Sequence, residues 1–413
     1  MNYFIKTIYI NSLFHLENFE ISIADKKYPH LILTGKNGSG KTILLNAIAD
    51  FINRIKGRSN LDFLSIEDNL HYWQNRLETV SGQKEQMQAK ANIKHYNDFL
   101  DEIFGKVDVI FTNVGDVVEK YNKGDFVVAF YQADRKVQMI EPKNPTKPQY
   151  NKKGNVKDTA TGQFLNFLSD LKIQEALARN EKQIDDANEI NAWFVDFEKL
   201  LQKIFQDKNL KLEFNYKNYS FVICTSGKKF KFTQLSDGFA AALDIVADLI
   251  LKMQDDNSLT REYKKEGIVL IDEIETHLHL GLQKIIMPLL TKVFPNVQFI
   301  ITTHSPFVLN SMEDAVAYDL EHRKPIEDLT NYSYESLAEG YFGVSTESSA
   351  VEMRLNRLKE LFDQKEKSDS DKNEIRQLMA ELDKVSEAVS PDLVGEYLKL
   401  KLHNINVIKE IGK

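Results

Sequence analysis

The feature that most restricts the fold is a glycine-rich octapeptide, which follows an apolar stretch at 31–33 and opens an apolar-periodic stretch at 41–54. Its residues are Gly35, Lys36, Asn37, Gly38, Ser39, Gly40, Lys41 and Thr42. Glycine lets backbone N–H groups approach an anion closely, and the N-terminus of the following helix favours negative charge. The spacing is typical of a phosphate-binding loop, in which the lysine reaches the β- and γ-phosphates and the threonine hydroxyl binds Mg²⁺. A chance glycine-rich turn is the alternative, but the strand and helix around the octapeptide favour nucleotide binding.

Two carboxylates follow a second apolar stretch. Residues 268–271 are all apolar, and Asp272 and Glu273 come next. Such a run is typical of a buried parallel strand, and it places both acids at the carboxyl end of that strand. With the phosphate loop present, we expect Asp272 to hold Mg²⁺ and Glu273 to orient or deprotonate the attacking water. Without that loop, an apolar strand that ends in two acids would be unremarkable.

A third apolar strand is predicted at 297–302, and His304 follows it. A single predicted helix at 280–293 separates it from the strand at 268–271, which is the crossover that neighbouring parallel strands require. His304 is therefore expected near the γ-phosphate, with a purely structural histidine as the alternative. Upstream, Leu235-Ser236-Asp237-Gly238 precedes a predicted amphipathic helix and in isolation is an ordinary N-cap.

The order of these motifs resembles a known family. GKNGSGKT, LSDG, IVLIDEIETHLH and ITTHSP follow one another as in the ABC-type ATPases of the RecF, Rad50/SMC and OLD branch. The resemblance implies an α/β P-loop NTPase of the ABC/SMC-head type, with a central mixed sheet, an antiparallel β subdomain, a helical insertion and a helical C-terminal tail. It also implies ATP and Mg²⁺ as cofactors and a head-to-tail homodimer or higher even oligomer. Ser236 and Gly238 of one copy would then complete the γ-phosphate site of the other.

The resemblance assigns two further segments. Residues 130–135 lie where the family keeps a glutamine or arginine sensor, which implies that Gln132 and Arg135 contact the nucleotide and that Gln132 also binds Mg²⁺. A plain strand end is the alternative for both residues. Residues 275–279 match the loop that, in this family, reports on the opposite subunit.

Several departures from the family narrow the function. The signature is LSDGF rather than the transporter-type LSGGQ, and the insertion is too short for a long coiled-coil arm. Asp369 and Asp371 form an Asp-x-Asp without a preceding apolar strand, so they are expected on a solvated face or in a loop rather than in a nuclease site. A head without its own nuclease resembles the stand-alone ATPases of Septu- and retron-type anti-phage defence, and residues 332–344 and 396–400 resemble tails of the Septu-type ATPases. This implies an effector partner, either an HNH or Toprim-type nuclease or a toxin.

The main alternative is a DNA-repair ATPase of the RecF or Rad50 kind that clamps DNA when ATP is bound. Its candidate DNA contacts are the lysine-rich loop at 143–157 and Lys228, Lys229 and Lys231, for which solvated surface is the simpler explanation. The net charge of −8 disfavours DNA binding by bulk charge, so any such contact must be local. A scaffold with a vestigial site is a third alternative.

Composition sets the remaining bounds. The chain has 413 residues and a single cysteine, Cys224, which fits a reducing cytoplasm. Its first residues do not resemble a signal peptide, and no window approaches 18 uncharged apolar residues, so we expect a cytoplasmic protein without a membrane span. We expect four segments: an ATPase lobe at 1–60, a helical insertion at 61–205, a second ATPase lobe at 206–320 and a helical region at 321–413.

Overall fold

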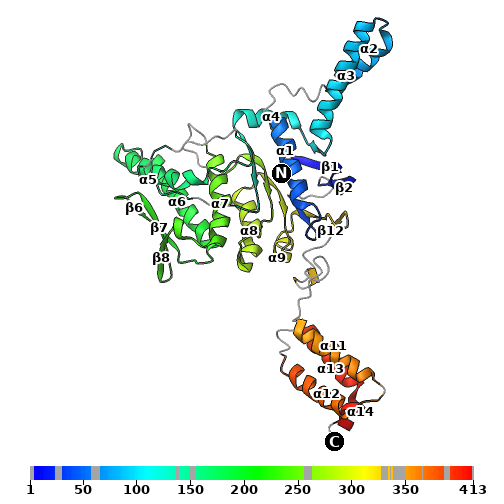
Figure 1. The fold of residues 1–413 in the computed structure, drawn as a ribbon. Coiled ribbons are helices and arrows are strands. Elements are labelled where there is room, and N and C mark those ends of the chain that lie inside the picture. The colour runs from blue at the N-terminus through cyan, green and yellow to red at the C-terminus, as the bar shows by residue number, and fades with distance from the viewer. Residues whose placement is uncertain are drawn as a thin grey trace. The chain divides into compact units, whose positions relative to one another are not determined.

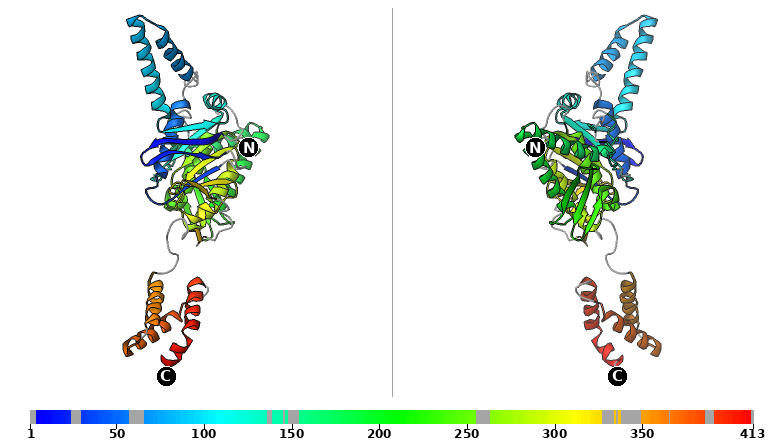
Figure 2. Two further views of the ribbon diagram at one scale, coloured as in Figure 1. Left: turned by 90° about the vertical axis from the view of Figure 1, so that its right-hand side faces the viewer. Right: turned by 90° about the vertical axis from the view of Figure 1, so that its left-hand side faces the viewer.

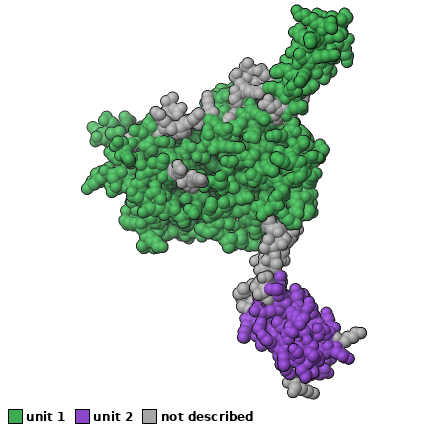
Figure 3. Space-filling model, in the orientation of Figure 1, with its two compact units in different colours: residues 1–334 green, residues 335–413 purple. Residues whose placement is uncertain are grey.

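A computed structural model gives the fold of the chain. It describes residues 4–23, 30–56, 66–135, 139–144, 146–147, 154–254, 263–326, 334, 336–337, 349–364, 366–385 and 391–411. The chain divides into two compact units, residues 1–334 and residues 335–413 (Figure 3).

Unit 1 is built on a six-stranded mixed sheet (Figure 1). Its strands are β3 (His30–Thr34), β5 (Phe126–Tyr131), β9 (Glu266–Ile271), β10 (Val297–Thr302), β11 (Ala315–Asp319) and β12 (Lys324–Ile326). The order across the sheet is β12-β11-β3-β10-β9-β5, and only β12 pairs antiparallel. The predicted strands at 31–33, 268–271 and 297–302 are confirmed.

The strands at the centre of this sheet are buried along their whole length. Every side chain of β3 and β10 is buried, which agrees with the continuous apolar runs that predicted them. β9 and β10 lie side by side and parallel, joined through α8 (Leu280–Val293), as the crossover argument predicted. The carboxyl ends of β3, β9 and β10 therefore lie at one edge of the sheet, where the predicted motifs follow.

Two antiparallel sheets complete the β-structure of unit 1. The first contains β1 (Ile5–Leu13), β2 (Leu16–Ser22) and β4 (Val107–Phe111) in the order β2-β1-β4. The second contains β6 (Lys211–Asn215), β7 (Ser220–Thr225) and β8 (Lys228–Lys231) in sequential order. Apolar residues of β1, β2, β3, α1 and β4 share one core cluster, so the first sheet packs with the phosphate-loop helix.

The described part of unit 1 contains further helices besides α8. They are α1 (Lys41–Lys56), α2 (Ile66–Thr79), α3 (Gln83–Phe104), α4 (Val114–Lys123), α5 (Phe164–Asn180), α6 (Ile184–Ile204), α7 (Asp237–Lys252) and α9 (Pro306–Leu309), with short 3₁₀ turns at Thr161–Gln163 and Phe232–Gln234. α2 and α3 form a hairpin that projects from the body of the unit (Figure 2). In the part of the chain described, no helix is both long and apolar enough to cross a lipid bilayer.

The end of unit 1 corrects one expectation. We expected helix beyond residue 320, but residues 324–326 form β12, which pairs with β11 at the edge of the central sheet. β12 is three residues long and contains Pro325, so its sequence carries little strand signal. Pairing with β11 decides its conformation, and an edge position tolerates the proline.

Unit 2 is helical, as predicted for the C-terminal region. Its helices are α11 (Ser349–Asp363), α12 (Asp369–Leu382), α13 (Pro391–His403) and α14 (Ile405–Ile411). They enclose their own apolar core, which includes Leu358, Leu361 and Ile375. Asp369 and Asp371 lie in the first turn of α12, where Asp371 forms a capping box with Ser368, so this pair serves as a helix start. Most of the segment 332–344 lies outside the described residues.

Candidate nucleotide site

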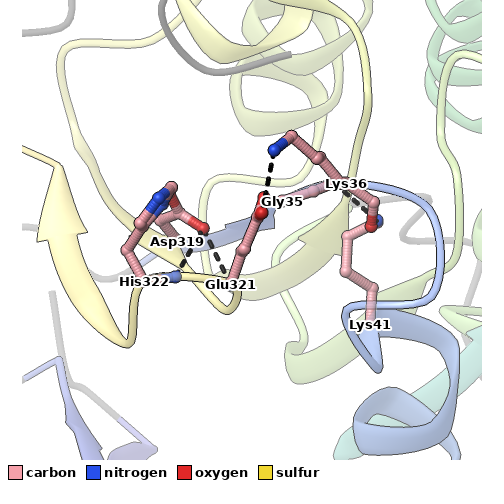
Figure 4. Close-up of polar contacts among 6 residues, drawn as sticks. All are labelled: Gly35, Lys36, Lys41, Asp319, Glu321 and His322. Atoms are coloured by element: carbon pink, nitrogen blue, oxygen red, sulfur yellow. Dashed lines mark hydrogen bonds and ion pairs between the residues drawn. The ribbon is translucent and has the colours of Figure 1, made fainter. Parts of the chain in front are cut away.

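The phosphate loop joins β3 to α1 and curls around its own lysine. Gly35, Gly38 and Gly40 have φ angles of 134°, 84° and 96°, a backbone region that residues with a side chain rarely adopt. The buried ammonium of Lys41 donates to the carbonyl oxygens of Gly35 at 2.8 Å and Lys36 at 3.1 Å (Figure 4). Burial lowers the pKa of Lys41 to about 8, although the nearby carboxylates of the 272–275 segment oppose this shift.

Side-chain oxygens of Thr42 in α1, Asp272 after β9 and Thr302 at the end of β10 meet beside the loop. The Thr42 hydroxyl donates to Asp272 Oδ1 at 3.2 Å, and the Thr302 hydroxyl at the end of β10 donates to the same oxygen at 2.6 Å. Asp272 is 2% exposed. The structure therefore brings together Thr42 and Asp272, two of the three residues predicted as Mg²⁺ ligands, and no contact of either with the third, Gln132, is seen among the described residues.

Glu273 follows directly in a strained backbone conformation. Its φ is +42°, in the left-handed region that costs a residue with a side chain about 1 kcal/mol or more. Its backbone N–H donates to the Thr302 hydroxyl at 2.7 Å, and Thr276 donates to its carboxylate at 3.4 Å. Thr302 therefore holds both the Asp272 carboxylate and the Glu273 backbone.

His304 is held in place by a half-buried acid, Glu275. Its backbone N–H and the Thr303 hydroxyl both donate to the carboxylate of Glu275, the latter at 2.7 Å. Burial and then the charge of Lys41 lower the pKa of His304, while burial raises the pKa of Glu275. The charges of Glu273 and Asp272 act on His304 in the opposite direction and raise its pKa.

The turn between β11 and β12 lies against the phosphate loop (Figure 4). Glu321 pairs with Lys36 at 2.9 Å, and Asp319 binds His322 Nδ1 at 2.6 Å. A side chain built at Gly35 would reach within 3.3 Å of the Asp319 carboxylate, so the two segments are closely packed. Asp319, Glu321 and His322 offer ligand atoms within 4.8 Å of one another, but Lys36, the His322 ring and backbone N–H groups already engage these carboxylates.

The remaining predicted residues lie on either side of this centre. Ser236 precedes α7 and is exposed, and its hydroxyl does not cap the helix. Gly238 lies in the first turn of α7, against the His277 carbonyl. Gln132 is exposed at the end of β5. Arg135 donates to backbone carbonyls of residues 272–274.

Sequence reasoning missed four residues that organise the site: Thr302, Glu275, Asp319 and Glu321. Thr302 carried a usable signal, because a polar residue ends an otherwise apolar strand directly before His304. Glu275 lay inside the motif IVLIDEIETHLH but was given no role of its own. Asp319 and Glu321 carried no signal, since their place beside the loop depends on the pairing of β11 with β3.

The mixed sheet, the loop between β3 and α1 and the acids after β9 define a P-loop NTPase head of the ABC/SMC type. A family model described as "AAA domain, putative AbiEii toxin, Type IV TA system" matches residues 89–310. Because that match spans more than half of the chain, the chain belongs to this family. The matched range starts after the phosphate loop and includes the 235–238 segment, both acids and His304.

Curated relatives come from two named systems. The Septu protein PtuA of Bacillus mycoides is 25% identical over 332 residues, which cover 78% of this chain and 41% of that protein. The Retron Vc95 probable ATPase of Vibrio cholerae is 24% identical over 353 residues, which cover 68% of this chain and 66% of that protein. The Retron Ec83 probable ATPase of Escherichia coli is 45% identical over 82 residues, 19% of this chain and 15% of that protein. The chain thus spans less than half the length of that PtuA protein.

Solved structures of SMC heads are also similar. The SMC head domain from Thermotoga maritima has a TM-score of 0.34 and 13% identity, covering 76% of this chain and 94% of that chain. An SMC head bound to the C-terminal winged-helix domain of ScpA has a TM-score of 0.36 and 12% identity, covering 76% of this chain and 93% of that chain.

Proposed function

We propose that the protein is an ATP-hydrolysing switch whose heads pair head-to-tail when ATP and Mg²⁺ bind. The observation that carries this proposal is the meeting of Thr42 and Asp272 at 3.2 Å next to a buried Lys41. A hydroxyl and a carboxylate are the oxygen ligands that Mg²⁺ prefers, so this pair fits the ion. The exposed Gln132 is proposed as a further ligand. When bound, Mg²⁺ would neutralise charge on the phosphates.

Each residue has a proposed part in hydrolysis. Lys41 would exchange the carbonyls of Gly35 and Lys36 for phosphate oxygens, since its ammonium already lies inside the loop. Glu273 would orient the attacking water and accept its proton. The lowered pKa of His304 leaves a neutral imidazole at neutral pH, suited to a hydrogen bond with the γ-phosphate rather than to an ion pair.

Pairing of two heads is proposed from the exposed start of α7. Ser236 is exposed and leaves its hydroxyl uncommitted to the helix, so it is accessible to the triphosphate of a second copy. The backbone N–H groups at the start of α7 would add a favourable electrostatic environment for that phosphate. Each site would then consist of the phosphate loop of one copy and the 235–238 segment of the other.

The biological setting is proposed from the relatives. Their names place them in Septu and retron systems, which supports a role in anti-phage defence in which the head controls a partner nuclease or toxin. The DNA-repair alternative is less favoured, because two of its candidate lysines already form ion pairs with acidic side chains. Lys229 pairs with Glu213 at 2.8 Å, and Lys231 pairs with Glu141 at 2.5 Å.

Substitution of Glu273 tests the hydrolytic assignment. Glu273→Gln is expected to lower phosphate release by about 10²–10⁴-fold, because the amide cannot accept a proton, while ATP binding is retained. Phosphate release and equilibrium binding of a fluorescent ATP analogue measure the two effects, with the exposed Glu313→Gln as the matched control. Unchanged hydrolysis in Glu273→Gln would contradict the assignment.

A mixing experiment tests the head-to-tail arrangement. Lys41→Ala removes the phosphate-loop half of a site, and Ser236→Arg blocks the other half, so each variant alone should be inactive. In a heterodimer of the two, one site combines both defects and the other is intact. Mixing should therefore restore part of the ATPase activity. Activity that stays absent in the mixture, with both variants folded, would exclude a site shared in this way.

A further inference from the structure

Arg135 contacts the backbone that carries the two proposed active-site acids. Its Nη1 donates to the carbonyl of Asp272 at 3.3 Å, and its Nη2 donates to those of Glu273 at 3.4 Å and Ile274 at 3.5 Å. The guanidinium therefore spans three consecutive carbonyls through its two terminal nitrogens. Each bond is long, but a delocalised cation facing three carbonyl dipoles acts on all of them at once.

The carbonyls that Arg135 contacts belong to the strained part of the loop. Glu273 has a φ of +42°, and this conformation persists only where surrounding contacts determine it. On one side, Thr302 supplies these contacts, because its hydroxyl accepts the Glu273 N–H and its carbonyl accepts the Ile274 N–H at 3.2 Å. Arg135 supplies the contacts to the carbonyls of the same residues. The direction of the Glu273 carboxylate thus depends on both.

The charge of Arg135 is balanced inside the protein. Burial lowers the pKa of Arg135, and Asp244 of α7, followed by Glu275 and Asp272, opposes this shift. Its Nε is buried and has no hydrogen-bond partner among the described residues, so the half-buried side chain keeps this position despite an unmet donor. An orphaned donor of this kind costs free energy, which indicates that the contacts made by the two terminal nitrogens hold the side chain in place.

We infer that Arg135 is a positioning residue that fixes the backbone of residues 272–274 and thereby aims the Glu273 carboxylate. This inference rests on the proposed ATPase function. It differs from the nucleotide-sensor role that the family resemblance implied, in which the guanidinium would contact the γ-phosphate. Because Gln132 is only three residues away, displacement of the segment after β5 would also reach Glu273 through these carbonyl contacts.

Kinetics of Arg135 variants distinguish the two roles. For Arg135→Ala we expect kcat to fall by up to about 100-fold, because a small displacement of the water-activating group is enough to slow the reaction. The dissociation constant for ATP should stay within about twofold of the parent, as expected when ground-state binding is unaffected. Added guanidinium ion at a non-denaturing concentration should restore part of kcat. Arg135→Lys should be intermediate, since one ammonium cannot span three carbonyls.

Two variants serve as controls. Arg179→Ala removes a surface arginine that pairs with Glu175 in α5, and it should change neither kcat nor ATP binding. Adding Arg135→Ala to Glu273→Gln should lower hydrolysis no further, because Arg135 acts through Glu273. Weaker ATP binding with unchanged kcat in Arg135→Ala would overturn the inference in favour of the sensor role.

Hydrogen exchange provides a readout that does not depend on ATPase activity. The N–H groups of Ile274 and Thr276 bond to the carbonyls of Thr302 and Glu273, and in Arg135→Ala without nucleotide both should exchange faster than in the parent. If the Arg135→Ala or the Arg135→Lys variant folds but the exchange rates of these two N–H groups stay as in the parent, the positioning role is wrong. A parent protein without hydrolysis would overturn the proposed function, and the exchange result would still decide the role of Arg135.

Discussion

At the residue scale, the buried side chain of His30 makes the stability of the fold depend on pH. It begins β3, is 2% exposed, and accepts the Phe299 N–H at Nδ1 over 3.1 Å. Burial lowers the pKa of His30 to about 4 from its usual 6.5. Below about pH 6.5, His30 therefore binds a proton in the unfolded chain, whereas in the folded protein it binds one only below about pH 4. The contribution of neutral, buried His30 to the free energy of unfolding is therefore complete above pH 6.5 and is lost as the pH falls from 6.5 to 4.

Stability of unit 1 should consequently decrease in mild acid because of His30. Between about pH 7.5 and pH 5, this group should cost the protein about 2 kcal/mol of unfolding free energy, and His30→Gln should remove that component. Urea unfolding followed by tryptophan fluorescence measures it, because both tryptophans, Trp73 and Trp193, lie in unit 1. The exposed His71→Gln is the control. The same pH dependence in His30→Gln and in the parent would refute this account.

At the scale of elements, the start of α7 is packed against the loop after β9. A Cβ built at Gly238 would lie 2.7 Å from the His277 carbonyl oxygen, and the rings of Phe239 and His279 meet edge to face at 5.4 Å. His277 has a φ of +68°, so this loop is itself in an unusual conformation. The proposed trans contact at Ser236 and the loop behind Glu273 therefore share one packed interface.

Gly238→Ala should destabilise unit 1 although alanine favours helix. Alanine has the better helix propensity by about 1 kcal/mol, but overpacking against backbone costs about 1–3 kcal/mol, and a carbonyl cannot rotate away. We expect a lower urea midpoint by tryptophan fluorescence. Gly395→Ala in α13 is the matched control, since nothing lies near its Cβ, and it should stabilise unit 2 by about 0.5–1 kcal/mol, measured by circular dichroism. If Gly238→Ala is as stable as the parent, the loop after β9 moves to accommodate the added methyl group, and the prediction is wrong.

At the scale of the whole molecule, each unit has a core of its own. In unit 2 the apolar cluster draws on α11, α12 and α13, and Leu358 and Ile375 are fully buried in it. Ion pairs between its helices, such as Arg357 with Glu374 at 2.8 Å, lie on the surface and contribute little to stability. Apolar burial therefore accounts for most of the stability of this unit.

A fragment of residues 335–413 should fold without unit 1. We expect a helical circular dichroism spectrum and a cooperative urea transition. Leu358→Ala should lower its unfolding free energy by about 2–5 kcal/mol, because it leaves a cavity in the core. Met353→Ala on the same helix is the control, since Met353 is 64% exposed and should change little. An unfolded fragment, or equal effects of the two substitutions, would contradict an independent core.

The sequence by itself determined the phosphate loop, the strands that precede Asp272 and His304, and their parallel order. These features are local, because glycine conformation, apolar runs and crossover lengths are set by nearby residues. It also carries a local signal for α4, since Asn113 caps the start of this helix and Gly124 its end. Only the tertiary structure decided that Thr302 hydrogen-bonds to both Asp272 and Glu273 and that β12 extends the sheet. It also decided that Arg135 donates to the backbone carbonyls of residues 272–274. The Arg135 contacts span about 140 positions of sequence, and no local pattern specifies which backbone a side chain meets across that distance.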